Sequence, residues 1–342
     1  MDKILTIVIP TYNMEKYLRR CLDSLIIDDK DLFDMLEVLV INDGSKDSSS
    51  AIAHQYQDKY PNVFRVIDKE NGHYGSCVNR GLEESKGKYL RILDSDDYYD
   101  SKSLNLFVKQ LMGVDVDSVY SPYSTILEAT GQVINHKANG YMAGDIIDLQ
   151  KTVLDDTFIH MHSLTYKVEL LRSINYRQEE GICYTDTEYV FYPLCYAKTM
   201  LYTNHCVYKY CVGRDEQSTT GISFANNIEH LEKVLYNISS YLPSEQNINY
   251  KHIQRKYIIV LLRFMIDAHL FYKFNDDKED KKLREIIKGY AKFPDVYYEL
   301  FESKWKGFYY VRSFVRNNTK DRYKLMLMVF LRNISPIIKG QK

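Results

Sequence analysis

The sequence predicts an α/β fold, in which helices flank a mixed, largely parallel sheet and a mainly helical region follows. Three observations predict it. Over the first hundred residues, apolar runs of strand length alternate with segments of helical periodicity. The apolar runs are continuous and rich in β-branched residues, as expected of strands that are buried on both faces. From about Phe224 onward, long helical patterns replace this alternation.

The first strand is expected at residues 4–9, an apolar run that stops at Pro10. Residues 15–26 follow with apolar side chains at helical spacing. A second buried strand is expected at residues 36–41, and Asp47 can cap the helix that runs from there to about residue 60. This order of elements begins a parallel sheet with helical crossovers.

A third strand is expected at residues 64–67, a helix at 76–85 and a fourth strand at 89–93. Strands and helices that alternate with short links imply right-handed crossovers. Beyond Ser101 the alternation is less regular, and residues 118–128 are predicted to form one strand. Short helices and strands are mixed over residues 148–210.

The length of 342 residues suggests two domains at roughly 100–200 residues per domain. We expect an α/β domain at residues 1–222, with a first half at 1–100 and a second half at 101–222. A helical, basic domain is expected at residues 223–342, where residues 228–241 and 253–272 carry long helical patterns.

Composition excludes several classes of protein. Hydrophobic residues make up 45% of the chain and charged residues 27%, which is an ordinary globular mix and argues against disorder. No window approaches the roughly 18 uncharged apolar residues of a membrane span, and the N-terminus shows no secretory leader. The six cysteines form no C-x-x-C pair. These features predict a cytoplasmic protein with reduced thiols.

The formal net charge of −1 conceals two halves of opposite sign. Residues 1–224 contain 23 Lys/Arg and 33 Asp/Glu, a net −10, whereas residues 225–342 contain 22 and 13, a net +9. Basic and aromatic residues alternate over residues 303–342, which suits the inner, anionic face of a membrane. A basic helix that packs on the acidic domain explains the pattern equally well. Base readout of nucleic acid has no support, and the sequence leaves homo-oligomerisation open.

Polar groups follow three of the first four predicted strands, where ligands of open α/β sheets bind. These groups lie in the segments 10–13 (PTYN), 42–45 (NDGS) and 94–97 (DSDD). Clustered carboxylates at a strand end repel one another, so a divalent metal such as Mg²⁺ or Mn²⁺ is the natural occupant of the last segment. A solvated acidic turn is the alternative.

Neither a G-x-G-x-x-G loop nor a G-K-[ST] motif follows the first strand, which argues against a dinucleotide dehydrogenase and a P-loop NTPase. The segments IVIPTYNMEKYL, VLVINDGSKDSS and NGHYGSCVNRGLEESKGKYLRILDSDD instead resemble the family 2 glycosyltransferases of the GT-A fold. The resemblance extends over about residues 1–220. It implies transfer of a sugar from a nucleotide diphosphate, with inversion at the anomeric carbon.

The resemblance also implies roles for particular residues. Asp43 matches the residue that binds the base, usually uracil. Asp94 and Asp96 match the D-x-D pair, with Asp94 near the ribose and metal and Asp96 as the more direct metal ligand. The residues expected to contact the nucleotide-sugar are Pro10, Thr11, Tyr12, Glu15, Asp43, Asp94, Ser95 and Arg214.

One departure from the family pattern concerns the diphosphate. Where the family often has Ala-Arg-Asn, this chain has Cys77-Val78-Asn79. Neutralisation of the phosphates would then depend on the metal, Arg80 or Arg214. The stretch NGHYGS, with His73 and Tyr74, is expected to line the donor-sugar pocket.

Inversion requires a general base beside the acceptor hydroxyl. The segment CYTDTEY resembles the family's Glu-Asp segment at a helix start, which gives Asp186 the place of the base and puts Thr185 at the usual Glu. Glu188 is the second candidate. On a helix, positions 186 and 188 point about 200° apart, so only one should face the pocket. The alternative role for Asp186 is that it only caps the helix.

His160 and His162 could ligate a metal from one strand face, although packed histidines are commoner; Met161 or His162 could line the acceptor pocket. The resulting hypothesis is a metal-assisted, inverting glycosyltransferase that uses a UDP-sugar and acts on a saccharide or lipid-linked saccharide in bacterial surface polysaccharide or glycolipid synthesis. The alternatives are a nucleotide-sugar nucleotidyltransferase and a non-catalytic glycosyltransferase-like partner subunit.

Overall fold

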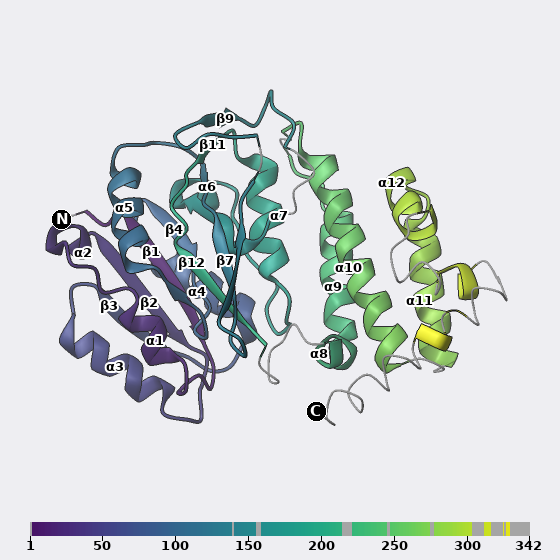
Figure 1. Cartoon of the computed structure of the whole chain (residues 1–342), viewed down its shortest axis with the longest axis horizontal. Coiled ribbons are helices and arrows are strands. Elements are labelled where there is room, and N and C mark those ends of the chain that lie inside the picture. Colours follow the sequence, from purple (N-terminus) through teal and green to yellow (C-terminus); the bar gives the residue numbers. More distant parts are fainter. Residues whose placement is uncertain are drawn as a thin grey trace. The chain divides into compact units, whose positions relative to one another are not determined.

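The structure is a computed structural model, and it describes residues 2–138, 140–154, 159–213, 221–244, 247–273, 277–302, 311–315, 324 and 326–328. The chain forms two compact units (Figure 1). Unit 1 comprises Met1–Arg214 with Leu242–Lys251, and unit 2 comprises Asp215–Tyr241 with His252–Lys342. The sequence placed the boundary at residue 222, and the segment 242–251 returns to unit 1 after that point.

An eight-stranded mixed sheet forms the centre of unit 1, in the order β3-β2-β1-β4-β10-β6-β11-β9. The first four strands of that order are parallel to one another, whereas β10 runs antiparallel to both β4 and β6. This confirms the predicted α/β class with a mixed sheet. The strands are β1 (Leu5–Thr11), β2 (Leu36–Asn42), β3 (Phe64–Asp68), β4 (Tyr89–Ile92), β6 (Ser118–Tyr120), β9 (Ile146–Asp148), β10 (Leu164–Lys167) and β11 (Thr199–Tyr202).

Helices cover both faces of the sheet, and β1 and β2 are therefore buried over their whole length. One face of β1, which carries Leu5, Ile7 and Ile9, belongs to a core shared with four helices. These are α1 (Leu18–Asp23), α2 (Lys30–Asp34), α3 (Ser49–Lys59) and α5 (Ser101–Met112). The opposite face carries α4 (His73–Glu84), α6 (Val168–Ser173) and α7 (Asp186–Tyr196).

A second sheet has the order β5-β12-β7-β8. Its strands are β5 (Tyr98–Tyr99), β7 (Tyr123–Leu127), β8 (Gln132–His136) and β12 (Tyr208–Val212). The prediction of one strand over residues 118–128 is therefore wrong, since β6 and β7 belong to different sheets. The break falls at Ser121-Pro122, where proline has no N–H for a ladder and restricts the residue before it.

Unit 2 is helical, as predicted for the C-terminal region. It contains α8 (Gly221–Asn226), α9 (Ile228–Ser240), most of α10 (Tyr250–Tyr272), α11 (Asp277–Tyr290) and α12 (Pro294–Tyr297), with π-helical turns at Tyr298–Glu302 and Val311–Val315. Buried side chains of α9 recur at Ile228, Leu231 and Leu235, which is the spacing of an amphipathic helix. No helix within the described residues is long and apolar enough to cross a membrane.

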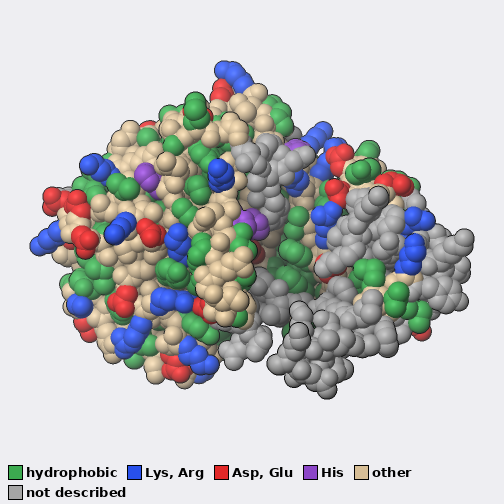
Figure 2. All heavy atoms as spheres, in the orientation of Figure 1, with side chains coloured by type: hydrophobic (Ala, Val, Ile, Leu, Met, Phe, Trp, Pro, Cys, Tyr) green, Lys and Arg blue, Asp and Glu red, His purple; other side chains and the backbone are tan. Residues whose placement is uncertain are grey.

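Most of the basic segment 303–342 lies outside the described residues, so the structure does not describe the predicted membrane-binding tail. On the face of unit 1 seen in Figure 2, acidic and basic side chains are interspersed. The acidic excess of residues 1–224 is thus not gathered into one patch on that face.

Helix α4 lies unusually close to β1 because position 81 has no side chain. A Cβ at Gly81 would lie 2.4 Å from Val8 Cγ1, which is far inside van der Waals contact. Gly81 therefore sets the distance between α4 and the sheet.

We expect Gly81→Ala to destabilise the protein by about 1–3 kcal/mol, the usual cost of overpacking a core. Val8→Ala removes the clashing methyl groups, so the double variant should be more stable than the two single effects predict. Urea unfolding measures both. The control is Gly289→Ala in α11, where a Cβ would meet nothing within 4 Å; this change should stabilise the protein slightly. Additive effects of the Val8 and Gly81 changes would contradict the proposed clash.

Candidate functional site

The loops after β1 and β2 are held together by reciprocal hydrogen bonds. The Asn13 N–H donates to Ser45 Oγ (3.0 Å), and the Lys46 N–H donates to Asn13 Oδ1 (2.7 Å). Asn13 adopts a φ of 54°, a left-handed conformation that asparagine tolerates. The two loops therefore form one rigid rim at the carboxyl ends of these strands.

Glu15 and Asp47 make a second reciprocal pair. The Glu15 N–H donates to Asp47 Oδ2 and the Ser48 N–H to Glu15 Oε2, both at 3.0 Å. Asp47 Oδ1 also accepts from the Ser49 N–H at the start of α3. In this structure Glu15 therefore joins the two loops and the start of a helix, and its predicted contact with the nucleotide-sugar stays a prediction.

The three residues predicted to contact base and ribose differ in exposure. Pro10 and Thr11 are buried in β1, and Thr11 Oγ1 donates to the Ile9 carbonyl at 3.1 Å. Tyr12 is 44% exposed. Among the three, only the Tyr12 ring is open to a ligand in this structure.

Asp43 is buried at the end of β2 and is already paired with a lysine side chain. Its Oδ1 accepts from Lys69 Nζ at 2.6 Å and from the Gly72 N–H at 2.9 Å. Lys69 Nζ also donates to Ser76 Oγ at 2.9 Å. Asp43 thereby ties the segment 69–76 to the rim, and no motif in the sequence indicates the role of Lys69.

The turn after β4 places acidic side chains close together. Burial and, after it, the neighbouring charge of Asp96 together raise the pKa of Asp94 to about 7. Ser95 is buried between them. The repulsion between these carboxylates is what a divalent cation would relieve, so the donor set fits the predicted metal.

No group of three or more His, Cys, Asp or Glu side chains in the described residues has the geometry of a metal site. A cation at Asp94 and Asp96 would therefore need further ligands from water or from substrate phosphates, which is the usual way in which proteins hold Mg²⁺.

Asp97, the third acid of the turn, is 1% exposed and binds β12 instead. Its Oδ2 accepts from Tyr208 Oη (2.8 Å) and its Oδ1 from the Cys211 N–H (2.7 Å). Tyr208 Oη in turn accepts from the Asp94 N–H at 3.2 Å. Asp97 and Tyr208 thus fix the turn to the second sheet, a long-range contact that the sequence did not reveal.

Asp186 lies at the first position of α7, directly after the N-cap residue Thr185. Backbone N–H groups of Asp186 and Thr187 donate to the Asp186 carboxylate, so this side chain also interacts with the start of the helix, and its role as the base stays a prediction. Burial raises the pKa of Asp186, so its carboxylate is a stronger base than an exposed aspartate. Tyr184, two residues earlier, has a φ of 69°, a strained conformation that costs about 1–3 kcal/mol and is common at functional sites.

Glu188, the second candidate base, points into the protein. It is fully buried, and its Oε2 accepts from the Glu179 N–H at 2.7 Å. Its carboxylate therefore holds the segment that leads to α7, whereas Asp186 is only partly buried. Of the two candidates, only Asp186 has an accessible side chain.

Tyr74 connects the acidic turn to the candidate base. Its hydroxyl donates to Asp94 Oδ1 at 3.0 Å and to Met161 Sδ at 3.4 Å. The charges of both Asp94 and Asp186 raise the pKa of Tyr74, after the larger effect of burial. One phenol therefore contacts the Asp94 carboxylate and is affected by the charge of Asp186. Its neighbour His73 has a φ of 63°, a second strained residue at the site.

Helix α4 also holds the segment before α7. Asn79 Nδ2 donates to the Gln178 carbonyl (3.0 Å), and the Gln178 N–H donates to Asn79 Oδ1 (2.8 Å). A Cβ on Gly75 would lie 2.1 Å from the Glu179 carbonyl oxygen. Glycine at position 75 thus lets the segment approach close enough to place Asp186 near Tyr74.

The remaining predictions concern two arginines, a histidine and the cysteines. Arg214 lies outside the described residues. Arg80 forms an ion pair with Glu84 one turn further along α4, at 2.6 Å. The ring of His162 packs on Tyr208 and Tyr210, with centroids 4.5 and 4.3 Å away. All six cysteines are free thiols.

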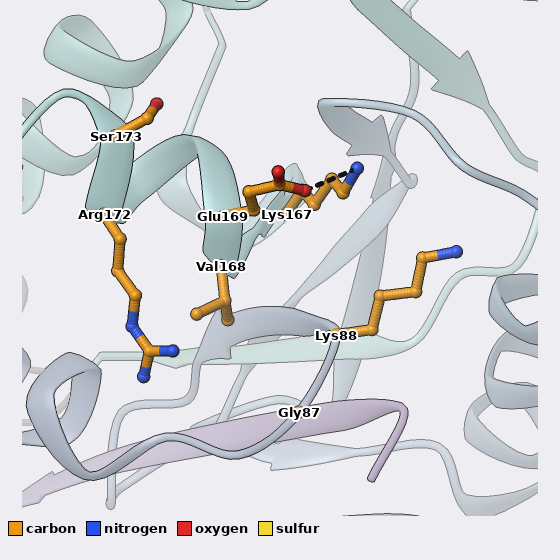
Figure 3. Close-up of a pocket in the computed structure, with 7 residues that line it drawn as sticks. All are labelled: Gly87, Lys88, Lys167, Val168, Glu169, Arg172 and Ser173. Atoms are coloured by element: carbon orange, nitrogen blue, oxygen red, sulfur yellow. Dashed lines mark ion pairs between the residues drawn. The ribbon is translucent and has the colours of Figure 1, made fainter. Parts of the chain in front are cut away.

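A pocket lies at the other end of the strands of the large sheet, next to the residues that precede β4. It is lined by Gly87, Lys88, Lys167, Val168, Glu169, Arg172 and Ser173 (Figure 3). Its cations already have partners, since Lys167 pairs with Glu169 and Asp115, and Arg172 Nη2 donates to the Ser85 carbonyl. The Arg172 contact caps the end of α4, and none of the residues that line the pocket belongs to the acidic turn.

Comparison with known proteins identifies the α/β unit. The family model described as glycosyl transferase family 2 matches residues 6–174. The putative glycosyltransferase EpsH of Bacillus subtilis is 33% identical over 130 residues, which are 38% of this chain and 36% of that protein. The minor teichoic acid biosynthesis protein GgaB of B. subtilis is 29% identical over 176 residues, 50% of this chain and 19% of that protein. The match thus spans about a third or less of these relatives.

Among solved structures, Staphylococcus aureus TarS 1–349 in complex with UDP-GlcNAc superposes with a TM-score of 0.61 at 16% sequence identity. The match covers 99% of this chain and 92% of that one. At this identity the likeness establishes the fold, which is the GT-A type that the sequence motifs predicted.

The raised pKa of Asp94 predicts a pH-dependent stability. The folded protein retains this proton up to about pH 7, whereas an unfolded chain releases it near pH 4. The folded state therefore binds more protons in this window, and its stability falls as the pH rises through it.

We expect Asp94→Asn to raise the melting temperature of the metal-free protein at pH 8, because it removes a repelling charge worth on the order of 3 kcal/mol. The gain should vanish at pH 5, where Asp94 is protonated. Thermal unfolding in EDTA measures this. Asp100→Asn is the control, since hydrogen bonds from Ser103 hold the pKa of Asp100 below its usual value despite partial burial. An equal gain at both pH values would show that Asp94 is not the titrating group.

Proposed function

We propose that the chain transfers a sugar from a nucleotide diphosphate to an acceptor hydroxyl, because the model of glycosyl transferase family 2 matches residues 6–174. The observation that carries the proposal is the contact of Tyr74 with Asp94 and its electrostatic coupling to Asp186. Both acids that the reaction needs, one for the donor and one for the acceptor, thus lie around one side chain.

UDP is the expected nucleotide. TarS has been solved with UDP and with UDP-GlcNAc, and its fold is shared by this chain. The exposed ring of Tyr12 and the carboxylate of Asp43 flank the rim where a base would bind. The Asp43–Lys69 ion pair keeps a cation within the segment 69–76, so a lysine stands near the donor rim, although the family arginine is absent at Val78.

A divalent metal, when bound, would neutralise the departing diphosphate as a Lewis acid. Asp96 and Asp94 would hold it. Tyr74 donates to Asp94 Oδ1 and Tyr208 Oη accepts from the Asp94 backbone N–H, so both the carboxylate and the backbone of Asp94 are held in place.

Asp186 would take the proton of the acceptor hydroxyl as the oxygen attacks the anomeric carbon on the face opposite the leaving diphosphate, which inverts the configuration. Its burial strengthens it as a base, and the start of α7 supplies N–H groups that stabilise its ionised form. Intact acids at positions 43, 94, 96 and 186 argue against a non-catalytic subunit. The loop after β1 lacks the glycine-rich, basic sequence of a nucleotidyltransferase.

The setting that we propose is synthesis of a bacterial cell-surface polymer, as for the relative GgaB, whose name refers to teichoic acid. The acceptor would be a saccharide or lipid-linked saccharide. The net +9 of residues 225–342 supports a cytoplasmic protein that binds an anionic membrane through residues 303–342.

Donor binding should depend on the metal. We expect UDP to bind in the presence of Mn²⁺ and to bind at least about tenfold more weakly in EDTA or in Asp96→Ala, because unscreened carboxylates then face the diphosphate. Isothermal titration measures the affinities, and Asp115→Ala at the opposite edge of the sheet is the control. Metal-independent affinity would remove the metal from the proposal.

The base assignment makes a separate prediction. Asp186→Asn should leave UDP affinity unchanged within about twofold and lower the rate of sugar transfer by at least about a hundredfold, the usual scale of general-base catalysis. A screen of nucleotide-sugars with Mn²⁺ by thermal shift comes first, to choose the donor. Glu188→Gln should instead lower the melting temperature, because it weakens a buried hydrogen bond to the Glu179 N–H. A wild-type rate in Asp186→Asn would exclude this residue as the base.

A further inference from the structure

A row of rings crosses the second sheet from the acidic turn outward. Strand pairing places Tyr208 opposite Tyr123, and Tyr123 opposite His136. Side chains directly opposite each other on neighbouring strands share one face of a sheet. The rings of Tyr123 and His136 are stacked, with centroids 4.4 Å apart and planes inclined by 12°.

The 3₁₀ turn η1 (Met161–Ser163) adds two histidines to this face. The His162 ring packs on Tyr208 and Tyr210, and the His160 ring lies nearly parallel to it, with centroids 6.1 Å apart and planes inclined by 9°. The His160 ring also lies 5.5 Å from that of Tyr123. We call these six residues the ring platform: Tyr123, His136, His160, His162, Tyr208 and Tyr210.

The inner end of the ring platform adjoins the candidate site. Tyr208 Oη donates to Asp97 and accepts from the Asp94 N–H. Met161, between the two histidines, accepts the hydrogen bond from Tyr74. The platform therefore starts at the residues that would surround the transferred sugar.

The outer end is open to solvent. His160 is exposed, and Tyr210 and His136 are partly exposed. Thr125 Oγ1 lies 2.9 Å from His136 Nε2 and fixes the orientation of that ring. The platform thus extends from a buried end at the acidic turn to an accessible end on β8.

One buried group on the platform lacks a partner within the described residues. His162 is 7% exposed, and its Nδ1 has no hydrogen-bond partner there. An unsatisfied buried polar atom is destabilising, and such an atom commonly marks a place where a ligand or water binds. Burial also lowers the pKa of His162 well below its usual value, so the ring is neutral and can accept or donate one hydrogen bond.

From this geometry we infer that the ring platform binds a neutral saccharide ring of the acceptor, next to the sugar unit that receives the transferred residue. Sugar rings present an apolar face of C–H bonds and a rim of hydroxyls. Aromatic rings bury the apolar face, while imidazole and threonine groups pair with hydroxyls. The assignment to the acceptor rests on the proposed glycosyltransferase function.

The test uses the full chain and simple probes, namely the methyl glycosides of β-glucose, β-galactose and N-acetyl-β-glucosamine. Saturation-transfer NMR with UDP and Mn²⁺, and again without them, should show transfer to ring C–H protons of at least one glycoside. In His160→Ala and in Tyr210→Leu, which keeps an apolar side chain, that signal should fall about fivefold or more. His205→Ala, on the loop that leads into β12, should retain it.

UDP affinity, measured in the same samples, should stay within about twofold in all variants, because the platform begins beyond the nucleotide rim. No signal from any glycoside, or a signal that survives both platform variants, would overturn the inference. If wild-type protein fails to bind UDP yet shows a platform-dependent glycoside signal, the saccharide site stands and the proposed transferase function fails.

Discussion

The structure of unit 1 depends on crowding of carboxylates at the carboxyl end of its sheet. Asp94, Asp96 and Asp97 occupy one turn, and the charge of Asp186 reaches Asp94 from α7. Hydroxyl donors stabilise the cluster, because Tyr74 bonds to Asp94 and Tyr208 to Asp97. Hydrogen bonds from neutral groups reduce the repulsion but leave the net charge in place, so the cluster favours a cationic ligand. A protein without need of a cation would gain stability by replacing these acids.

The same crowding explains why α4 is packed so closely. Its first turn must carry Tyr74 to the acidic turn while its body lies on β1, which requires Gly81 against Val8. Its outer surface must hold the segment 178–180, which requires Gly75 and the Asn79 hydrogen bonds. One helix thus sets the position of the donor-side acid and of the segment leading to Asp186. A displacement of α4 would change both at once, which couples stability of the sheet to geometry of the site.

The sequence predicted the parts of this arrangement that are local. Continuous apolar runs predicted β1 and β2 because burial on both faces leaves no alternation, and the strand ends placed Asp43 and Asp94 on one edge. It did not predict that α4 begins at His73, because a positive φ at a histidine has no sequence signature. Nor did it predict that residues 118–128 divide between two sheets. Tyr208 and Asp97 are 111 residues apart, and the antiparallel pairing of β12 with β5, the strand that directly follows Asp97, brings them together.

The two sheets also differ in the chemical groups that they present. The carboxyl end of the large sheet carries acidic side chains, and its loops are hydrogen-bonded to one another, as Asn13 is to Ser45 and Lys46. This rim is therefore rigid and charged. The second sheet presents rings and a threonine hydroxyl, and the turn η1 packs a neutral buried histidine against it. A nucleotide diphosphate requires charge neutralisation, whereas a sugar ring requires an apolar surface with few directional partners. Tyr208 belongs to both surfaces, since its hydroxyl bonds to the acidic turn and its ring packs on His162. A single tyrosine therefore sets the distance between the charged surface and the ring surface.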